Sequence, residues 1–320
     1  MMSVAARFPQ WCWLLCATAL LSGCAQYPVR VLENFSEPKA AHSFNGVAID
    51  SGDIVISQPY GPLSLFFALY PREFQPYMHA GVLVIEDDRA YVYHAMGVIK
   101  PAFGGPPTRS VGGGIFRTPL DEFIYAQRYV EIFQPDPAIE RARVVAFARA
   151  QYRNGTPFDP YFDSEDRRRL YCTEFVAAAL EAGGAEPFPV RPNRVNPSLQ
   201  MIKEWLGVRA NGSIQASDLI IGYRHTATFS AEDSLTRTRL RIAAYREIYR
   251  RFTPDQKLGN VFQWDGTRLE FRDSVHEFLA AALVLSDDAA NPSPDEIDAA
   301  VAALARKMFG AVQMQAANQH

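Results

Sequence analysis

The segment 78–95 constrains the fold more than any other part of the chain, because it carries the pattern of a two-stranded hairpin. Two runs rich in β-branched and aromatic residues, 78–85 and 90–95, flank the polar tetrad Glu86-Asp87-Asp88-Arg89. Such residues favour strands over a helix, and a short polar stretch between them is typical of a hairpin turn. The segment therefore predicts an antiparallel pair of strands.

The register of this hairpin brings two histidines together. With a loop of two or of four residues, His94 lies opposite Gly81 and His79 lies opposite Met96. The histidines are then diagonal neighbours on one face, with Cβ atoms about 7 Å apart or less, and Gly81 leaves space between them. A loop of three residues would instead send the two histidines to opposite faces.

One thiol remains in the folded part of the chain once an N-terminal leader is set aside. Cys172 opens a run whose apolar positions, 172, 175, 176, 179 and 180, recur with helical spacing. The free N–H groups and positive end of a helix favour thiolate, so we expect reaction with thiol reagents well below the ordinary pKa of about 8.5. The alternative is a small buried hydrophobic residue, the commoner fate of a free cysteine.

A thiol and two converging histidines are the parts of a cysteine hydrolase. We expect Cys172 to be the nucleophile, His79 the base, and His94 the group that orients His79. The Cys172 backbone N–H, with a phenol from Tyr171 or Tyr161, is a candidate oxyanion donor, although each tyrosine is equally suited to packing. A metal site lacks ligands at recognisable spacing, so no metal or cofactor is predicted.

Charged residues near the cysteine have plainer interpretations. Glu174 lies two residues after Cys172 and points away from it on a helix, which indicates a structural or capping carboxylate. The run Arg167-Arg168-Arg169 would lower the thiol pKa or attract an anionic substrate if it faced the site. We favour the alternative of a solvated turn paired with Glu165 and Asp166.

The N-terminus has the layout of a secretory signal. Arg7 precedes an apolar run at 11–21, and the segment ends in Leu21-Ser22-Gly23-Cys24. These last residues resemble the bacterial lipobox, which implies a lipid on Cys24. Ala25 in place of Asp implies sorting to the outer membrane, facing the periplasm. An ordinary cleaved signal or an uncleaved anchor helix is the alternative.

The chain divides into four parts by its patterns: a lipoprotein signal peptide at 1–23, a lipidated N-terminus and tether at 24–44, a catalytic domain at 45–225, and a helical extension at 226–320. The 320 residues are 48% hydrophobic, enough for one good core and a smaller one. The net charge of -3 argues against a general nucleic-acid partner. The oligomeric state is not predicted.

Helical periodicity predicts three helices in the extension, at 236–252, 274–285 and 294–309. The first has six arginines, which would suit an anionic membrane surface, but its apolar positions form no clean stripe. We therefore favour a packed helix with exposed arginines. Within the catalytic domain we expect a helix from Asp136-Pro137 to Asn154-Gly155 and a last strand at 219–221.

Four motifs together resemble the permuted papain-like amidases related to NlpC-type peptidases, the YiiX-like group. They are Gly52-Asp53-Ile54-Val55, His79-Ala80-Gly81-Val82, Pro157-Phe158-Asp159-Pro160-Tyr161-Phe162-Asp163, and Tyr171-Cys172-Thr173-Glu174-Phe175-Val176. The last is close to the group's Tyr-Cys-Ser-Glu-Leu-Val signature. The histidine strand precedes the cysteine helix, as in that group and reversed from papain. The resemblance covers about residues 48 to 200.

The resemblance implies an α+β fold with a circularly permuted papain-like, NlpC-type core: a small antiparallel sheet and a cysteine helix, here followed by the helical extension. It also implies hydrolysis of an amide or ester through an acyl-enzyme, with Cys172 as nucleophile and His79 as base. One departure is His94, which stands where a carboxylate or other polar group is expected.

We therefore expect a lipid-anchored envelope cysteine hydrolase that cleaves an amide, with peptidoglycan stem peptide as the leading substrate. One alternative is a lipid-directed acyl hydrolase or acyltransferase on the same fold. Another is a non-catalytic binding lipoprotein, against which the intact Cys172 and His79 weigh.

Overall fold

The predicted hairpin forms strands β5 (His79–Glu86) and β6 (Arg89–Ile99) in the computed structural model. Asp87 and Asp88 make the two-residue turn, with φ angles of 49° and 61°. Two successive left-handed residues match the right-handed twist of the flanking strands. Val82 pairs with Tyr93, so the predicted register is confirmed and the three-residue loop is excluded.

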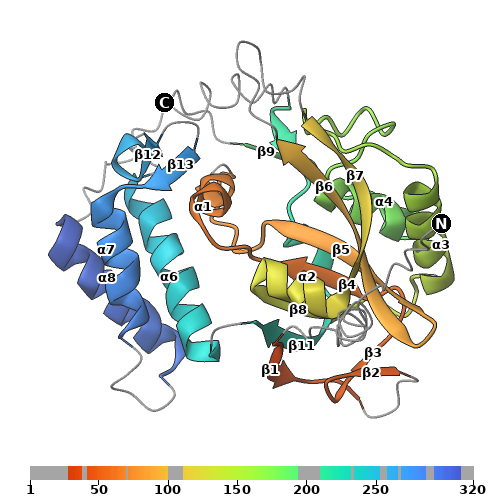
Figure 1. Ribbon diagram of the computed structural model, residues 1–320, viewed down its shortest axis with the longest axis horizontal. Coiled ribbons are helices and arrows are strands. Elements are labelled where there is room, and N and C mark those ends of the chain that lie inside the picture. The colour runs from red at the N-terminus through yellow and green to blue at the C-terminus, as the bar shows by residue number, and fades with distance from the viewer. Residues whose placement is uncertain are drawn as a thin grey trace, which may run out of the picture.

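The structure describes residues 28–37, 42–69, 71–99, 111–193, 210–231, 234–252, 258–265, 268–285 and 292–310. The predicted signal peptide and Cys24 lie outside these ranges. Within them the fold is α+β, with a main sheet beside a lobe of helices (Figure 1).

The main sheet has seven strands in the order β1-β11-β8-β4-β5-β6-β7, and every ladder in it is antiparallel. The sheet is therefore larger than the small one expected. Its remaining strands are β1 (Arg30–Asn34), β4 (Ile54–Ser57), β7 (Val111–Pro119), β8 (Tyr129–Gln134) and β11 (Arg224–Ser230).

Part of the predicted tether at 24–44 belongs to the fold. Residues 30–34 form the edge strand β1, paired with β11. The strands β2 (His42–Phe44) and β3 (Val47–Ile49) make a separate two-stranded sheet. The sequence missed β1 because a short edge strand buries little apolar surface and so shows little alternation.

Helices cover both faces of the main sheet (Figure 1). Helix α2 (Leu120–Gln127) packs on one face through Phe123 and Ile124. Helices α3 (Arg141–Arg153) and α4 (Cys172–Ala182) pack on the other. Apolar side chains of β5 alternate between the two faces, with Val82 in one core and Leu83 in the other, as a strand buried on both sides requires.

The helical lobe consists of α6 (Leu235–Phe252), α7 (Asp273–Leu283) and α8 (Pro294–Phe309), with the hairpin β12 (Phe262–Asp265) and β13 (Arg268–Phe271). A 3-10 helix, Leu258–Asn260, precedes β12. The three helices agree with those expected from periodicity.

The core of this lobe also includes α1 (Pro62–Leu69), through Leu65, Ala68 and Leu69. The helices after residue 226 therefore share their core with a segment from the middle of the predicted catalytic domain. Figure 1 shows α1 between the lobe and β5.

The structure corrects two predicted elements. Helix α3 begins at Arg141, because Asp136 instead closes a turn by accepting the Ala138 N–H at 2.8 Å. Residues 218–220 form a 3-10 helix, Asp218–Ile220, where a strand was expected. The short strands β9 (Arg191–Pro192) and β10 (Gly212–Ser213) pair nearby.

The arginine-rich helix α6 is packed, as expected, but several of its arginines form ion pairs that were not expected. Leu240, Ala244 and Ile248 are buried in the lobe core. Four arginines pair with carboxylates: Arg239 with Glu33 at 3.1 Å, Arg246 with Asp298 at 2.6 Å, and both Arg250 and Arg251 with Glu247 at 3.3 and 2.8 Å. Among the described residues, no helix combines the length and apolarity needed to cross a membrane.

Candidate functional site

The two histidines of the hairpin are hydrogen-bonded to each other. His79 Nε2 lies 2.9 Å from His94 Nδ1, and the rings are nearly perpendicular with centroids 5.0 Å apart. Gly81 makes this possible, because a Cβ there would lie 3.2 Å from His94 Cβ and 2.5 Å from Val92 Cγ1. The predicted convergence of His79 and His94 is therefore present.

The far side of His94 is held by Thr118 on β7. His94 Nε2 lies 3.0 Å from Thr118 Oγ1. Phe123 of α2 packs against both imidazoles, stacked on His79 at 5.8 Å and edge-on to His94 at 5.0 Å. Both nitrogens of His94 are thus engaged, and the ring orientation of His79 is fixed.

Two tautomer assignments satisfy this chain of contacts, because the Thr118 hydroxyl can either accept from His94 Nε2 or donate to it, and a base at His79 Nδ1 requires the first. When His79 donates from Nε2 to Nδ1 of His94, His79 Nδ1 keeps its lone pair, and His94 donates from Nε2 to Thr118. Among the described residues, His79 Nδ1 has no hydrogen-bond partner. That atom is the one available to accept a proton.

Cys172 is the first residue of α4, as its sequence pattern predicts. Its Sγ donates to the backbone carbonyl oxygen of Met78, the residue before His79, at 3.9 Å. The β5–β6 ladder ends at Val82 and Tyr93, so β5 is unpaired with β6 where it meets the sulfur. The thiol therefore lies beside the backbone that carries His79.

Burial sets the protonation of both groups. It raises the pKa of the Cys172 thiol to about 11. Hydrogen bonds from backbone N–H groups, of which that of Ala80 contributes most, lower this pKa but do not outweigh burial. Burial lowers the pKa of His79 to about 4. The pKa of His94 falls well below its usual value through burial and the nearby His79. The resting pair is thus neutral thiol and neutral imidazole.

This result corrects the expectation that the helix N-terminus makes Cys172 a thiolate. The dipole contribution is about 0.3–1 kcal/mol near a surface. The cost of burying a charge beside the sheet is larger and has the opposite sign. The residue Cys172 as a whole is partly accessible to solvent.

The pH dependence of Cys172 reactivity follows from these directions. Above pH 4 His79 is neutral and carries a lone pair that can accept a proton, whereas below about 4 it is protonated and a base at this position is lost. We expect the acid limb of turnover near pH 4, and the iodoacetamide reaction of Cys172 to rise with pH toward about 11. An alkylation rate that levels off below pH 8 would contradict the neutral pair.

Tyr171 is placed differently from the expected oxyanion donor. Its side chain is 1% exposed, and its hydroxyl bonds Ser164 Oγ at 2.7 Å and accepts the Ile214 N–H at 3.1 Å. The phenol therefore ties the cysteine helix to two loops. A role for the Tyr161 phenol stays a prediction, and the backbone N–H of Cys172 at the helix start is the remaining candidate donor.

Glu174 caps the cysteine helix, as its position predicted. The Tyr171 N–H donates to Glu174 Oε2 at 3.4 Å. Burial raises the pKa of Glu174 to about 8. Its part is to begin the helix at Cys172 and not to react.

The motif 157–163 shapes the loop before the cysteine. Asp159 accepts the Tyr161 N–H at 2.9 Å and also the Asp163 N–H. Phe162, with φ of 54°, packs its ring 5.1 Å from that of Tyr171. The motif is therefore a scaffold for the helix start.

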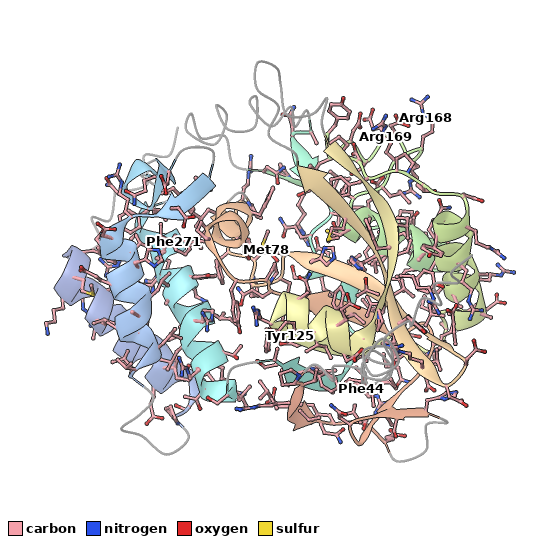
Figure 2. The ribbon with its side chains drawn as sticks, in the orientation of Figure 1. Phe44, Met78, Tyr125, Arg168, Arg169 and Phe271 are labelled. Atoms are coloured by element: carbon pink, nitrogen blue, oxygen red, sulfur yellow. The ribbon has the colours of Figure 1, made fainter. Side chains whose placement is uncertain are left out.

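The arginine run beside this loop faces solvent. Arg167 pairs with Glu181 at 2.6 Å, and Arg168 pairs with Asp166 at 2.7 Å. Figure 2 shows Arg168 and Arg169 at the outer edge of the molecule. The interpretation as a solvated, paired turn is confirmed for Arg168, whereas Arg167 pairs with the cysteine helix.

Sequence reasoning missed Thr118, Phe123 and Met78. Thr118 pairs with Val92 across the β6–β7 ladder, which makes it a diagonal neighbour of His94. The β6–β7 register was needed to find it. Met78 was quoted only as the start of the strand, and nothing local predicts that its carbonyl meets a sulfur from a residue 94 positions later.

Thr118 offers a direct check of the histidine chain. Replacing it with valine keeps the shape but removes the oxygen that faces His94 Nε2, so we expect a stability loss of about 1 kcal/mol and slower turnover. Thr118→Ser retains the hydroxyl and is the matched control. Thermal unfolding and turnover of both variants measure the difference. Equal behaviour of the two would show that the hydroxyl does not matter.

Comparison with solved structures finds likeness of fold at low sequence identity. No family model matches the chain, and no curated protein matches it. A solved structure described as metalloprotein YiiX from Escherichia coli O157:H7, DUF1105, is 19% identical, with a TM-score of 0.42. The match covers 58% of this chain and 98% of that one.

No group of three or more His, Cys, Asp or Glu among the described side chains is arranged to hold a metal ion.

Proposed function

We propose that this protein is a cysteine hydrolase that cleaves an amide bond through an acyl-enzyme on Cys172. The observation that carries the proposal is the chain of contacts around His79. Its Nε2 is hydrogen-bonded to His94, and its Nδ1 has no hydrogen-bond partner within the described part of the chain. The backbone carbonyl oxygen of its neighbour Met78 accepts a hydrogen bond from the Cys172 thiol. This arrangement supports a permuted papain-like core of the NlpC type.

The first half of the reaction transfers the acyl group. His79 Nδ1 takes the thiol proton as Sγ bonds to the substrate carbonyl carbon, which gives a tetrahedral oxyanion. The Cys172 N–H donates to that oxyanion. The C–N bond then breaks, His79 returns the proton to the leaving amine, and a thioester remains.

The second half restores the enzyme. His79 takes a proton from water as the water oxygen attacks the thioester carbon. The C–S bond breaks, the sulfur regains the proton, and a carboxylic acid leaves. Because the resting pair is neutral, each proton moves within the reaction step, and His94 stabilises the transient imidazolium by accepting from its Nε2.

We propose a peptide of the bacterial envelope, such as the peptidoglycan stem, as the substrate. The lipobox-like Leu21-Ser22-Gly23-Cys24 supports this choice, because a lipid on Cys24 would hold the protein at the outer membrane, facing the periplasm. The membrane is then a partner through that lipid.

The test traps the acyl-enzyme. The protein without its leader is incubated separately with peptidoglycan fragments and with phospholipid vesicles, quenched in acid, digested, and searched by mass spectrometry for an acyl adduct on Cys172. We expect a peptidyl adduct and a free amine, both absent after alkylation of Cys172. A fatty-acyl adduct would overturn the amide assignment, and no adduct from either source would favour a binding lipoprotein.

A further inference from the structure

The segment 71–78 connects α1 to β5 and ends directly before His79. Its last residues are fixed on the sheet: the Met78 N–H donates to the Ser57 carbonyl oxygen at 2.9 Å, and the Tyr77 hydroxyl donates to Glu131 Oε2 at 2.9 Å. Gln75 bonds Ser217 through its side chain. These contacts hold the end of the segment directly before the first residue of β5, so the position of the segment and the start of β5 are linked.

The other end of the segment is fixed by the helical lobe. The Tyr249 hydroxyl of α6 lies 3.2 Å from the Pro71 carbonyl oxygen and also contacts that of Arg72. Tyr249 is 7% exposed, and its ring packs edge-on to Phe74 with centroids 5.8 Å apart. A buried hydroxyl with these acceptors defines where the segment lies.

Met78 joins the lobe to the thiol. Its side chain packs against the lobe core with that of Phe74. Its carbonyl oxygen accepts a hydrogen bond from the Cys172 thiol, and the next residue in the chain is His79. Figure 2 places Met78 where the chain passes from α1 to β5. One residue thus contacts the lobe through its side chain and the candidate site through its backbone.

We infer that the helical lobe positions the catalytic pair, with Tyr249 as the positioning residue that holds segment 71–78 in place. The inference rests on the proposed function and assigns a task to the helices beyond residue 226. The lobe core sets the position of Met78, and Met78 sets both the carbonyl that faces Cys172 and the start of the strand that carries His79. A misplacement of about 1 Å at such a site costs roughly 10²-fold in rate.

The test uses Tyr249→Phe in the full folded chain. The ring stays, so packing on Phe74 is kept, and only the hydroxyl is lost. We expect turnover to fall roughly ten- to hundredfold with little change in KM. We also expect the acid limb of the pH profile to move up from about 4 toward 6.5, because a looser segment exposes more of His79 to water.

Tyr245→Phe is the matched control. Tyr245 is a buried tyrosine of the same helix, and its hydroxyl accepts the Gly61 N–H at 3.3 Å, at the far end of α1 from His79. We expect a similar loss of stability in thermal unfolding but an unchanged kcat and acid limb. Unchanged kinetics in Tyr249→Phe, or equal losses in both variants, would overturn the inference.

Alkylation of Cys172 by iodoacetamide separates this inference from the proposed function, since it needs no substrate. If His79→Ala slows alkylation and Tyr249→Phe does not, the lobe does not position the pair although the pair exists. If His79→Ala leaves alkylation unchanged, thiol and imidazole are uncoupled and both proposals fail. Should Tyr249→Phe not fold, Phe74→Leu, which keeps every hydrogen bond, is measured in its place with the same outcomes.

Discussion

Replacing His79 with alanine is expected to slow turnover of the scissile amide by about 10²–10⁴-fold, the range for loss of a positioned general base. The physical reason is the high pKa of Cys172, which burial raises to about 11. At neutral pH the thiol keeps its proton unless a neighbour takes it. Cys172→Ala removes the proposed nucleophile and is expected to abolish acyl-enzyme formation entirely.

The same substitution should leave the fold in place. His79 is partly exposed at the start of β5, and its removal leaves His94 still bonded to Thr118. His42→Ala is the matched control, because His42 lies on the separate strand β2. Turnover and thermal unfolding are measured on all variants. A His79→Ala protein with wild-type turnover would rule out this histidine as the base.

Gly81→Ala is expected to destabilise the protein by about 1–3 kcal/mol, as overpacking of a filled core does. An alanine Cβ would lie 2.5 Å from Val92 Cγ1 and 2.9 Å from the Tyr93 carbonyl oxygen. Val92 is fully buried and the carbonyl belongs to the paired strand, so neither moves easily. The strands must separate, which also pulls His94 away from His79.

Gly112→Ala on β7 is the control for this change, because a Cβ there meets nothing within 4 Å. Its effect should lie within about 0.5 kcal/mol of zero. Denaturant unfolding measures both variants, and the imidazole signals in NMR spectra report the histidine contact. If Gly81→Ala and Gly112→Ala have the same free energy of unfolding, the close packing described around Gly81 is contradicted.

Much of the site followed from local patterns. The polar tetrad centred the hairpin, and strand pairing then fixed which residues stand opposite each other, so the meeting of His79 and His94 needed no tertiary information. Helical spacing likewise placed Cys172 at the start of α4. Glu174 as a cap is also a local effect, set by a separation of three residues from Tyr171.

Other features depended on contacts between distant segments. The occupied hydroxyl of Tyr171 requires Ile214, and the support of His94 requires the register of β7. The membership of α1 in the lobe core was equally hidden, because its apolar residues suit either partner. Periodicity tells which side of a helix is buried but not against what.

The sequence by itself determined the order of the chemical groups and the hairpin register, because both arise from spacing along the backbone. Only the tertiary structure decided the charge state of the thiol and the imidazole. A pKa depends on how much water and how many dipoles surround a group, and segments remote in sequence supply those surroundings. Packing against the sheet reversed the shift that the helix end alone had predicted for Cys172.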